Sequence, residues 1–324
     1  MTQIENWAVA ADLQPRPGDW RFDLDHVFDA VVGLSTTVPA DAFTAPVLGT
    51  ERAGHGVVIR EGVVLTVGYL ITEADTVWIA CRDGRLIQGD PIGYDHETGF
   101  GLVQALGRLD LPVLPMGHSK SVAVGGAALV AASGGRSRSL AARVIAKQEF
   151  AGYWEYLLDE ALFTAPAHPF WGGTALIAPS GELIGIGSLH LERALRGGGS
   201  EPINMMVPIE LLPPILGDLL AFGRPQRPPR PWLGMLASDL DDSLTVIGLV
   251  ERGPAVQAGL QIGDVVLAVG EVATTDLAEL FREIWALGPA GVEVPLRLWR
   301  EGRVIEARVH SAARDAFLRR PRLH

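Results

Sequence analysis

The chain has 324 residues, of which 48% are hydrophobic and 20% are charged, and its net charge is −11. This length gives room for two domains, and the composition is typical of a globular protein. The negative charge is spread along the chain, so general binding to nucleic acid or anionic lipid, which needs a basic face, is not expected. The single cysteine, Cys81, excludes an internal disulfide and a cysteine-based zinc site, and we expect it to be a buried structural thiol.

The N-terminal residues 1–27 are polar and interrupted by prolines, and they predict an extension with one short helical turn. The first residues lack the basic start and the apolar segment of a signal peptide. No apolar run in the chain is long enough to span a bilayer. These features predict a cytoplasmic protein without membrane insertion.

From residue 28 onward, short apolar runs alternate with glycine-rich turns. The runs Gly56–Ile59, Val63–Thr66 and Thr76–Ala80 are too short and too rich in β-branched residues for helices. The dipeptide Asp83-Gly84 that follows is typical of a hairpin turn. Further runs of this kind lie at 101–105, 127–131, 142–146 and 183–187. Many short strands with regular turns predict an all-β barrel architecture.

One loop carries a strong functional signal: Ala167-His168-Pro169-Phe170-Trp171-Gly172-Gly173-Thr174-Ala175-Leu176, followed by Ser180-Gly181-Glu182-Leu183-Ile184-Gly185-Ile186. It resembles the nucleophile loop of HtrA-type trypsin-like serine proteases, which reads N-P-G-N-S-G-G-P-L before a short strand and a D-G-E-like turn. The alignment needs no gap and places Gly172 at the position of the nucleophilic serine. Glycine has no side chain, so this position cannot attack a carbonyl.

Five further segments resemble the same family in the same order: His55–Ile71, Arg82–Arg85, Tyr94–Leu102, Leu114–Ser119 and Met205–Ile209. The resemblance covers residues 28–215 and implies a mainly β fold, a trypsin-like double six-stranded β-barrel. In HtrA-like proteins the N-terminal segment often mediates trimer contacts. A homo-oligomer, a trimer by resemblance, is therefore one expectation for this chain.

The C-terminal third predicts a second domain. Residues 216–231 are rich in proline and arginine and predict a stiff polyproline-II-like linker. Residues 232–312 resemble a PDZ domain, which is an α+β fold, and the motifs that carry this resemblance are Trp232-Leu233-Gly234-Met235, Glu251–Ala255, Ala258–Leu260 and Gly263–Val269. We expect residues 313–324 to be a frayed basic tail.

The resemblance to serine proteases also locates the catalytic triad. In these enzymes serine attacks, histidine takes its proton, and aspartate orients the histidine. Projected onto this chain, the histidine position is Tyr69, the aspartate position is Gly99 and the serine position is Gly172. Tyrosine has an ordinary pKa near 10 and is a poor general base at neutral pH. The resemblance therefore implies a degenerate triad with no catalytic residue.

The oxyanion hole of the family uses backbone N–H groups of the serine and of the residue two positions before it. Here that earlier residue is Phe170, where the family has glycine, so the hole is not expected to form. Phe170 and Trp171 either fill the vacated cleft or form an aromatic contact surface for a partner. His55 replaces a small residue of the family motif, and we interpret it as a structural histidine.

The PDZ segment keeps the features that peptide binding requires. A PDZ groove captures a C-terminal carboxylate on backbone N–H groups and adds the peptide as a β-strand. The expected peptide-binding residues are those of the loop and two of the following helix: Trp232, Leu233, Gly234, Met235, Leu280 and Ile284. A groove that is closed against its own chain is the alternative to an open one.

The residues favour a catalytically inactive pseudoprotease that acts as a protein-binding scaffold, accessory subunit or adaptor, with other proteins as partners. One alternative is a peptidase with non-standard catalytic residues, in which His96 near Gly99 or His168 near Gly172 would be the base. Another is a chaperone-like protein that holds unfolded clients. The eight histidines are scattered without metal-binding spacing, so no metal and no cofactor are expected.

Overall fold

The computed structural model describes residues 7–195, 197–240 and 243–319. The chain divides into two compact units. The first unit comprises residues 1–148, 160–225 and 319–324, and the second comprises residues 149–159 and 226–318. The segment 149–159 contains the end of one strand of the second barrel, the turn after it and the start of the next strand, and it groups with residues 226–318.

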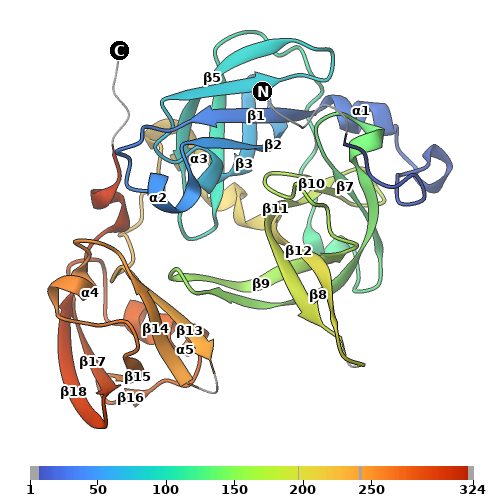
Figure 1. The fold of residues 1–324 in the computed structure, drawn as a ribbon. Helices are drawn as coiled ribbons and strands as arrows, with labels where there is room; N and C mark the ends of the chain where they lie inside the picture. Colours follow the sequence, from blue (N-terminus) through green and yellow to red (C-terminus); the bar gives the residue numbers. More distant parts are fainter. Residues whose placement is uncertain (1–6, 196, 241–242, 320–324) are drawn as a thin grey trace. The chain divides into compact units, whose positions relative to one another are not determined.

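The first unit is built on two closed barrels of six antiparallel strands (Figure 1). The first barrel has the order β1-β2-β3-β6-β5-β4 and the second has the order β10-β11-β12-β9-β8-β7. The strands of the first barrel are β1 (Val31–Thr37), β2 (Glu51–Arg60), β3 (Val63–Val67), β4 (Thr76–Ala80), β5 (Leu86–Tyr94) and β6 (Phe100–Ala105). Those of the second are β7 (Ala127–Ala131), β8 (Leu140–Gly152), β9 (Tyr156–Ala165), β10 (Ala175–Ile177), β11 (Leu183–Ala194) and β12 (Ser200–Pro208).

Each barrel closes around apolar side chains from its own strands. In β3 and in β10 every residue is buried, as expected for short runs without a solvent-facing side. The remaining elements of this unit are α1 (Leu24–Asp29), α2 (Ala45–Leu48), α3 (Pro213–Phe222) and the 3₁₀ turns Pro17–Asp19, Gly68–Leu70, Ser119–Ser121, Arg136–Arg138 and Ile209–Leu211. Cys81 is buried, which confirms the expectation for its thiol. The mainly β double barrel is likewise confirmed.

The second unit contains a sheet of order β13-β14-β15-β17-β18, with β16 paired to β15. Its elements are β13 (Met235–Leu240), β14 (Ser243–Leu249), α4 (Pro254–Gln257), β15 (Val265–Val269), β16 (Val272–Ala273), α5 (Leu277–Ala286), β17 (Glu293–Arg300), β18 (Arg303–His310) and the 3₁₀ turn Arg314–Phe317. Asp276 caps α5 by accepting the Glu279 N–H at 2.8 Å. The buried face of α5 includes Leu280, Phe281 and Ile284.

Two predicted boundaries differ from the structure. The linker predicted at 216–231 begins inside α3, because a proline starts this helix and Ile215, Leu216 and Leu219 give it a buried face. The tail predicted to be frayed forms a 3₁₀ turn, and the Phe317 ring lies 4.9 Å from the Trp232 ring. Aromatic packing therefore orders this part of the tail, while residues 320–324 lie outside the described residues.

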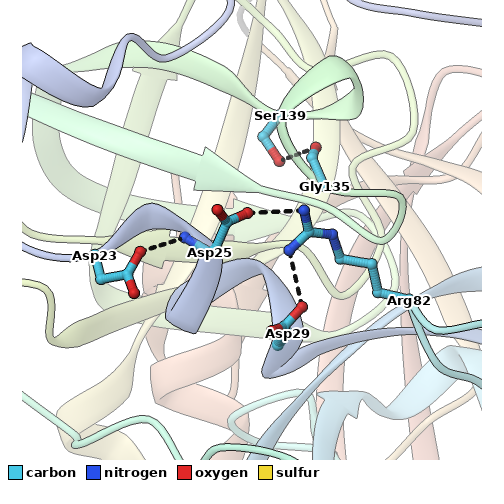
Figure 2. A network of polar contacts seen from close by, with 6 residues as sticks. All are labelled: Asp23, Asp25, Asp29, Arg82, Gly135 and Ser139. Atoms are coloured by element: carbon cyan, nitrogen blue, oxygen red, sulfur yellow. Dashed lines mark hydrogen bonds and ion pairs between the residues drawn. The ribbon is translucent and has the colours of Figure 1, made fainter.

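The described part of the N-terminal extension packs on the first unit. Figure 2 shows the guanidinium of Arg82 between two carboxylates of α1, at 2.8 Å from Asp29 and 2.7 Å from Asp25. The Val9 N–H donates to the Ser137 carbonyl at 2.8 Å, so the extension also pairs with the loop after β7. The short helical turn expected in this region is α1.

Candidate functional site

The structure places the three projected triad positions beside one another in the first unit. Tyr69 lies in the 3₁₀ turn after β3, Gly99 directly precedes β6, and Gly172 lies in the loop before β10. The N–H of Gly68, next to Tyr69, donates to the Gly99 carbonyl at 2.7 Å. A Cβ built on Gly172 would lie 2.7 Å from the Tyr69 hydroxyl. The structure thus brings the three projected positions together, and the residues there are a tyrosine and two glycines.

Tyr69 is held as a hydrogen-bond donor. Its hydroxyl donates to the Ser188 carbonyl at 3.0 Å. Burial raises the pKa of the Tyr69 phenol above its ordinary value. The phenol is therefore protonated at neutral pH and cannot remove a proton from a nucleophile.

His168, which the sequence offered as an alternative base, has both ring nitrogens engaged by the backbone. Its Nε2 lies 2.7 Å from the Arg138 carbonyl and must carry a proton to donate there. Burial lowers the pKa of His168, so the ring is neutral and Nδ1 is an acceptor. The Phe170 N–H donates to this Nδ1 at 3.1 Å. The lone pair that a base would need is thereby occupied.

The same hydrogen bond removes a donor of the projected oxyanion hole. The hole would need the Phe170 N–H to point at a substrate oxygen, and here that N–H binds His168. The Phe170 carbonyl in turn accepts from His55 Nε2 at 3.1 Å. The backbone N–H and the carbonyl of Phe170 are thus both hydrogen-bonded to histidine side chains.

His55 has the structural role that its sequence context indicated. Its Nδ1 accepts from the Ser133 N–H at 3.2 Å, while its Nε2 donates to Phe170. Burial, with a further contribution from His168, lowers the pKa of His55 to about 3. His96, the other alternative base, lies in the turn before Gly99 with its ring 4.5 Å from the Tyr94 ring.

The aromatic pair at the loop is not packed as a unit. Phe170 is 43% exposed, and its ring meets the Trp7 ring edge-on at 4.9 Å. Trp7 also lies 5.4 Å from the His168 ring. Trp171 instead lies 5.2 Å from the His190 ring. Sequence reasoning missed Trp7, and the only signal for it was a large aromatic residue in the N-terminal extension.

The carboxylate-binding loop of the second unit binds a carboxylate in this structure, and it is that of Glu155. The N–H groups of Leu233, Gly234 and Met235 donate to the Glu155 carboxylate at 3.0, 2.8 and 3.2 Å. Gly234 has φ +70°, a conformation that favours glycine and turns these N–H groups toward one point. Sequence reasoning missed Glu155, although its position at the end of the aromatic turn Tyr153-Trp154 was a visible signal.

The remaining residues expected to bind peptide lie around this loop. Leu280 and Ile284 of α5 are fully buried in the apolar cluster that contains Leu233 and Met235. Trp232 is buried and pairs with Ala312 through two backbone hydrogen bonds of 3.0 Å. The loop and these two helix residues therefore share one apolar cluster, and their role in peptide binding stays a prediction.

The first unit consists of two closed six-stranded barrels that bring positions 69, 99 and 172 together, which defines a trypsin-like domain. The sheet of the second unit, with its carboxylate-binding loop, defines a PDZ domain. Comparison with protein families agrees: the trypsin-like peptidase domain matches residues 54–186 and the PDZ domain matches residues 231–310. Together with the relatives below, these matches show that the chain is similar to the HtrA-type serine proteases.

Among curated proteins, the chain is 26% identical over 266 residues to the probable periplasmic serine endoprotease DegP-like of Pseudomonas fulva (strain 12-X), covering 78% of this chain and 54% of that protein. It is 23% identical over 279 residues to the serine endoprotease DegS of Salmonella typhimurium (strain 14028s / SGSC 2262), covering 81% and 77%. The chain spans about half the length of the DegP-like relatives that it matches.

Solved structures share the fold. The HtrA-type protease AlgW with decapeptide superposes with a TM-score of 0.54 at 22% identity, covering 92% of this chain and 98% of that one. The serine endoprotease from Yersinia pestis gives a TM-score of 0.51 at 22% identity, covering 89% and 96%. Within the part of the chain that the structure describes, no helix has the length and apolar character needed to cross a membrane.

Proposed function

We propose that this chain is a catalytically inactive HtrA-like pseudoprotease that acts on other proteins by binding them, as a scaffold, accessory subunit or adaptor. The observation that carries the proposal is the pair Tyr69 and Gly172. The nucleophile position has no side chain, and the histidine position holds a buried, protonated phenol whose hydroxyl fills the space beside it.

More than one of the groups that catalysis needs is missing from the site. Removal of a triad member costs several orders of magnitude in rate, and the loss of one oxyanion donor costs about 10²–10³. Here all three triad groups are absent and the Phe170 N–H is bound to His168. A triad relocated to His168 has no support either, because both ring nitrogens of this histidine are engaged by backbone groups.

A peptidase assay tests the absence of catalysis, which matters because the relatives are described as serine endoproteases. The full chain is incubated with unfolded casein and, separately, with a fluorophosphonate probe that labels activated serines. We expect neither fragments nor labelling. Cleavage that rises with protein concentration and disappears in His168→Ala or His96→Ala would overturn the proposal and favour a peptidase with non-standard residues.

Co-purification tests the binding role. The tagged chain is recovered from its native cells at two ionic strengths, and bound proteins are identified by mass spectrometry and quantified against the bait. One stoichiometric partner supports a scaffold or subunit. A broad set of unfolded clients without a fixed partner would instead favour the chaperone-like alternative.

Several finer expectations stay predictions. Self-association as a trimer rests on the family resemblance alone. Phe170, with its exposed ring, is proposed as a partner contact together with Trp171. The cytoplasmic location also stays a prediction, and the relatives described as periplasmic stand against it.

A further inference from the structure

We propose that residues 153–157 are an internal ligand of the PDZ groove, with the Glu155 side chain in place of a peptide's terminal carboxylate. An external C terminus would enter the groove only after this segment is displaced. This inference rests on the proposed binding role of the chain. It states that residues 153–157, which belong to the same unit as the PDZ domain, occupy the groove.

The carboxylate contacts carry most of the argument. Glu155 Oε1 accepts from the Gly234 N–H at 2.8 Å and from the Leu233 and Met235 N–H groups at 3.2 Å, while Oε2 accepts from Leu233 at 3.0 Å. A PDZ loop captures a C terminus in the same way, by donating hydrogen bonds from successive backbone N–H groups to one carboxylate. With these donors bound to Glu155, a second carboxylate has no free donor in the loop.

The neighbouring backbone follows the same mode of binding. A PDZ ligand adds as a strand to the edge of the sheet and places an apolar side chain in a pocket. The Ala237 N–H of β13 donates to the Tyr153 carbonyl at 3.1 Å. Leu157 is 8% exposed and belongs to the buried cluster that contains Leu280 and Ile284 of α5. The segment therefore supplies the carboxylate, a main-chain contact and the apolar group of a ligand.

Charged side chains hold the two flanks of the segment on α5. Arg282 forms ion pairs with Glu149 before the turn and, at 2.8 Å, with Asp159 after it. Pairs as exposed as these contribute little each. Their positions on both sides of the turn nonetheless set the register in which Glu155 reaches the loop.

The backbone of Glu155 is strained in a way that fits a functional placement. Its φ is +60°, in the left-handed region that non-glycine residues rarely adopt. Such conformations persist where surrounding contacts over-determine them. The hydrogen bonds to Leu233, Gly234 and Met235 are contacts of this kind.

Hydrogen exchange of the full chain tests the internal occupancy directly. We expect the Leu233, Gly234 and Met235 amides to exchange about tenfold faster or more in Glu155→Ala than in the parent chain, since their acceptor is lost. Glu160→Ala is the matched control, because Glu160 follows on β9 and is exposed. Glu155→Gln, which keeps one acceptor oxygen, should be intermediate.

Amides of α5 and β15 in the same spectra report whether the domain stays folded. Equal exchange of the loop amides in the parent and both Glu155 variants would overturn the proposal. A uniform rise over the whole domain in Glu155→Ala, with no selective rise in Glu155→Gln, would also overturn it, because Glu155 would then be only a structural group.

A binding measurement separates this inference from the proposed function. The probe is a fluorescein-labelled decapeptide pool of random sequence with a free C-terminal leucine, chosen because Leu157 is the apolar residue of the internal segment. Tighter binding to Glu155→Ala than to the parent, lost with the amidated pool, supports displacement of an internal ligand. Equal binding to both proteins would overturn it. Loop amides released in Glu155→Ala without any peptide binding would leave the internal occupancy standing and count against the groove as an external binding site.

Discussion

The hydroxyl of Tyr69 lies 2.7 Å from the point where a side chain on Gly172 would begin. Real Cβ atoms do not approach an oxygen so closely, so a serine at 172 would require the Tyr69 hydroxyl to move in this backbone. The side chains that positions 69 and 172 can hold are thus coupled through this contact. Restoring one group without changing the other should disturb the structure.

Gly172→Ser should therefore destabilise the chain without creating activity. Overpacking of this kind typically costs about 1–3 kcal/mol. The free energy of unfolding from urea titration measures the loss. Tyr69→Phe, which removes the hydroxyl, should recover most of it in the double variant, as a double-mutant cycle will show.

Gly217→Ala is a suitable control for that experiment, because a Cβ on Gly217 meets no atom within 4 Å. This control should stabilise α3 slightly. Casein cleavage or fluorophosphonate labelling by Gly172→Ser would contradict the expectation for this site.

Acid should weaken the first unit through His55. Its pKa is lowered to about 3 in the folded chain, against about 6.5 when unfolded. The unfolded chain then binds the proton more tightly, so the stability contributed by neutral His55 is present above pH 6.5 and is lost as the pH falls. Between pH 7 and 5 the loss should be about 2 kcal/mol.

The measurement is the free energy of unfolding at several pH values for the parent chain, His55→Gln and His26→Gln. His55→Gln should show a flatter pH dependence. His26 is exposed, so its variant should follow the parent. A parent-like slope in His55→Gln would refute the assignment.

Peptide binding by the PDZ groove should strengthen as the pH rises through neutrality. Burial raises the pKa of Glu155 to about 7, while the three loop N–H groups and Arg314 favour its ionised form. The pKa of Glu155 is higher when the segment is docked in the loop than when it is released to solvent. The protonated form therefore favours docking, and docking weakens as the pH rises and the proton is lost. From pH 6 to 8 the internal segment should lose about tenfold in docking equilibrium.

Fluorescence polarisation with the leucine-ended peptide pool at pH 6, 7 and 8 measures this effect. The apparent affinity of the parent chain should rise with pH, and that of Glu155→Ala should not change. The other charged groups nearest the segment are Arg282 on α5 and its ion-pair partners Glu149 and Asp159 on the flanks. The same pH dependence in Glu155→Ala would show that another group is responsible.

Trp7→Ala should destabilise the first unit by about 1–2 kcal/mol, since an aromatic pair contributes about 0.5–1.5 kcal/mol beyond the area it buries. Trp7 meets the rings of both Phe170 and His168. Trp78→Ala is the control, because Trp78 is 46% exposed on β4. Urea titration of both variants checks the difference, and equal effects would show that the Trp7 contacts add no stability.

Much of the fold was predictable because it depends on patterns local in the chain. Short β-branched runs such as Val63–Thr66 cannot form stable helices, and the loop Trp232–Met235 has a recognisable spacing. The start of α3 was missed because its prolines suggested an extended linker, whereas a proline at the first helical turn is compatible with a helix.

The sequence by itself determined which functional groups are present: no serine at 172, no histidine at 69, and a PDZ loop with Gly234. These are identities of residues at aligned positions, and folding cannot change them. Only the tertiary structure decided what those positions contact. Glu155 reaches a loop 79 residues away in the chain to meet Gly234, and Phe170 is bound by His55 from 115 residues away. Such contacts depend on how distant segments pack, and no local pattern encodes them.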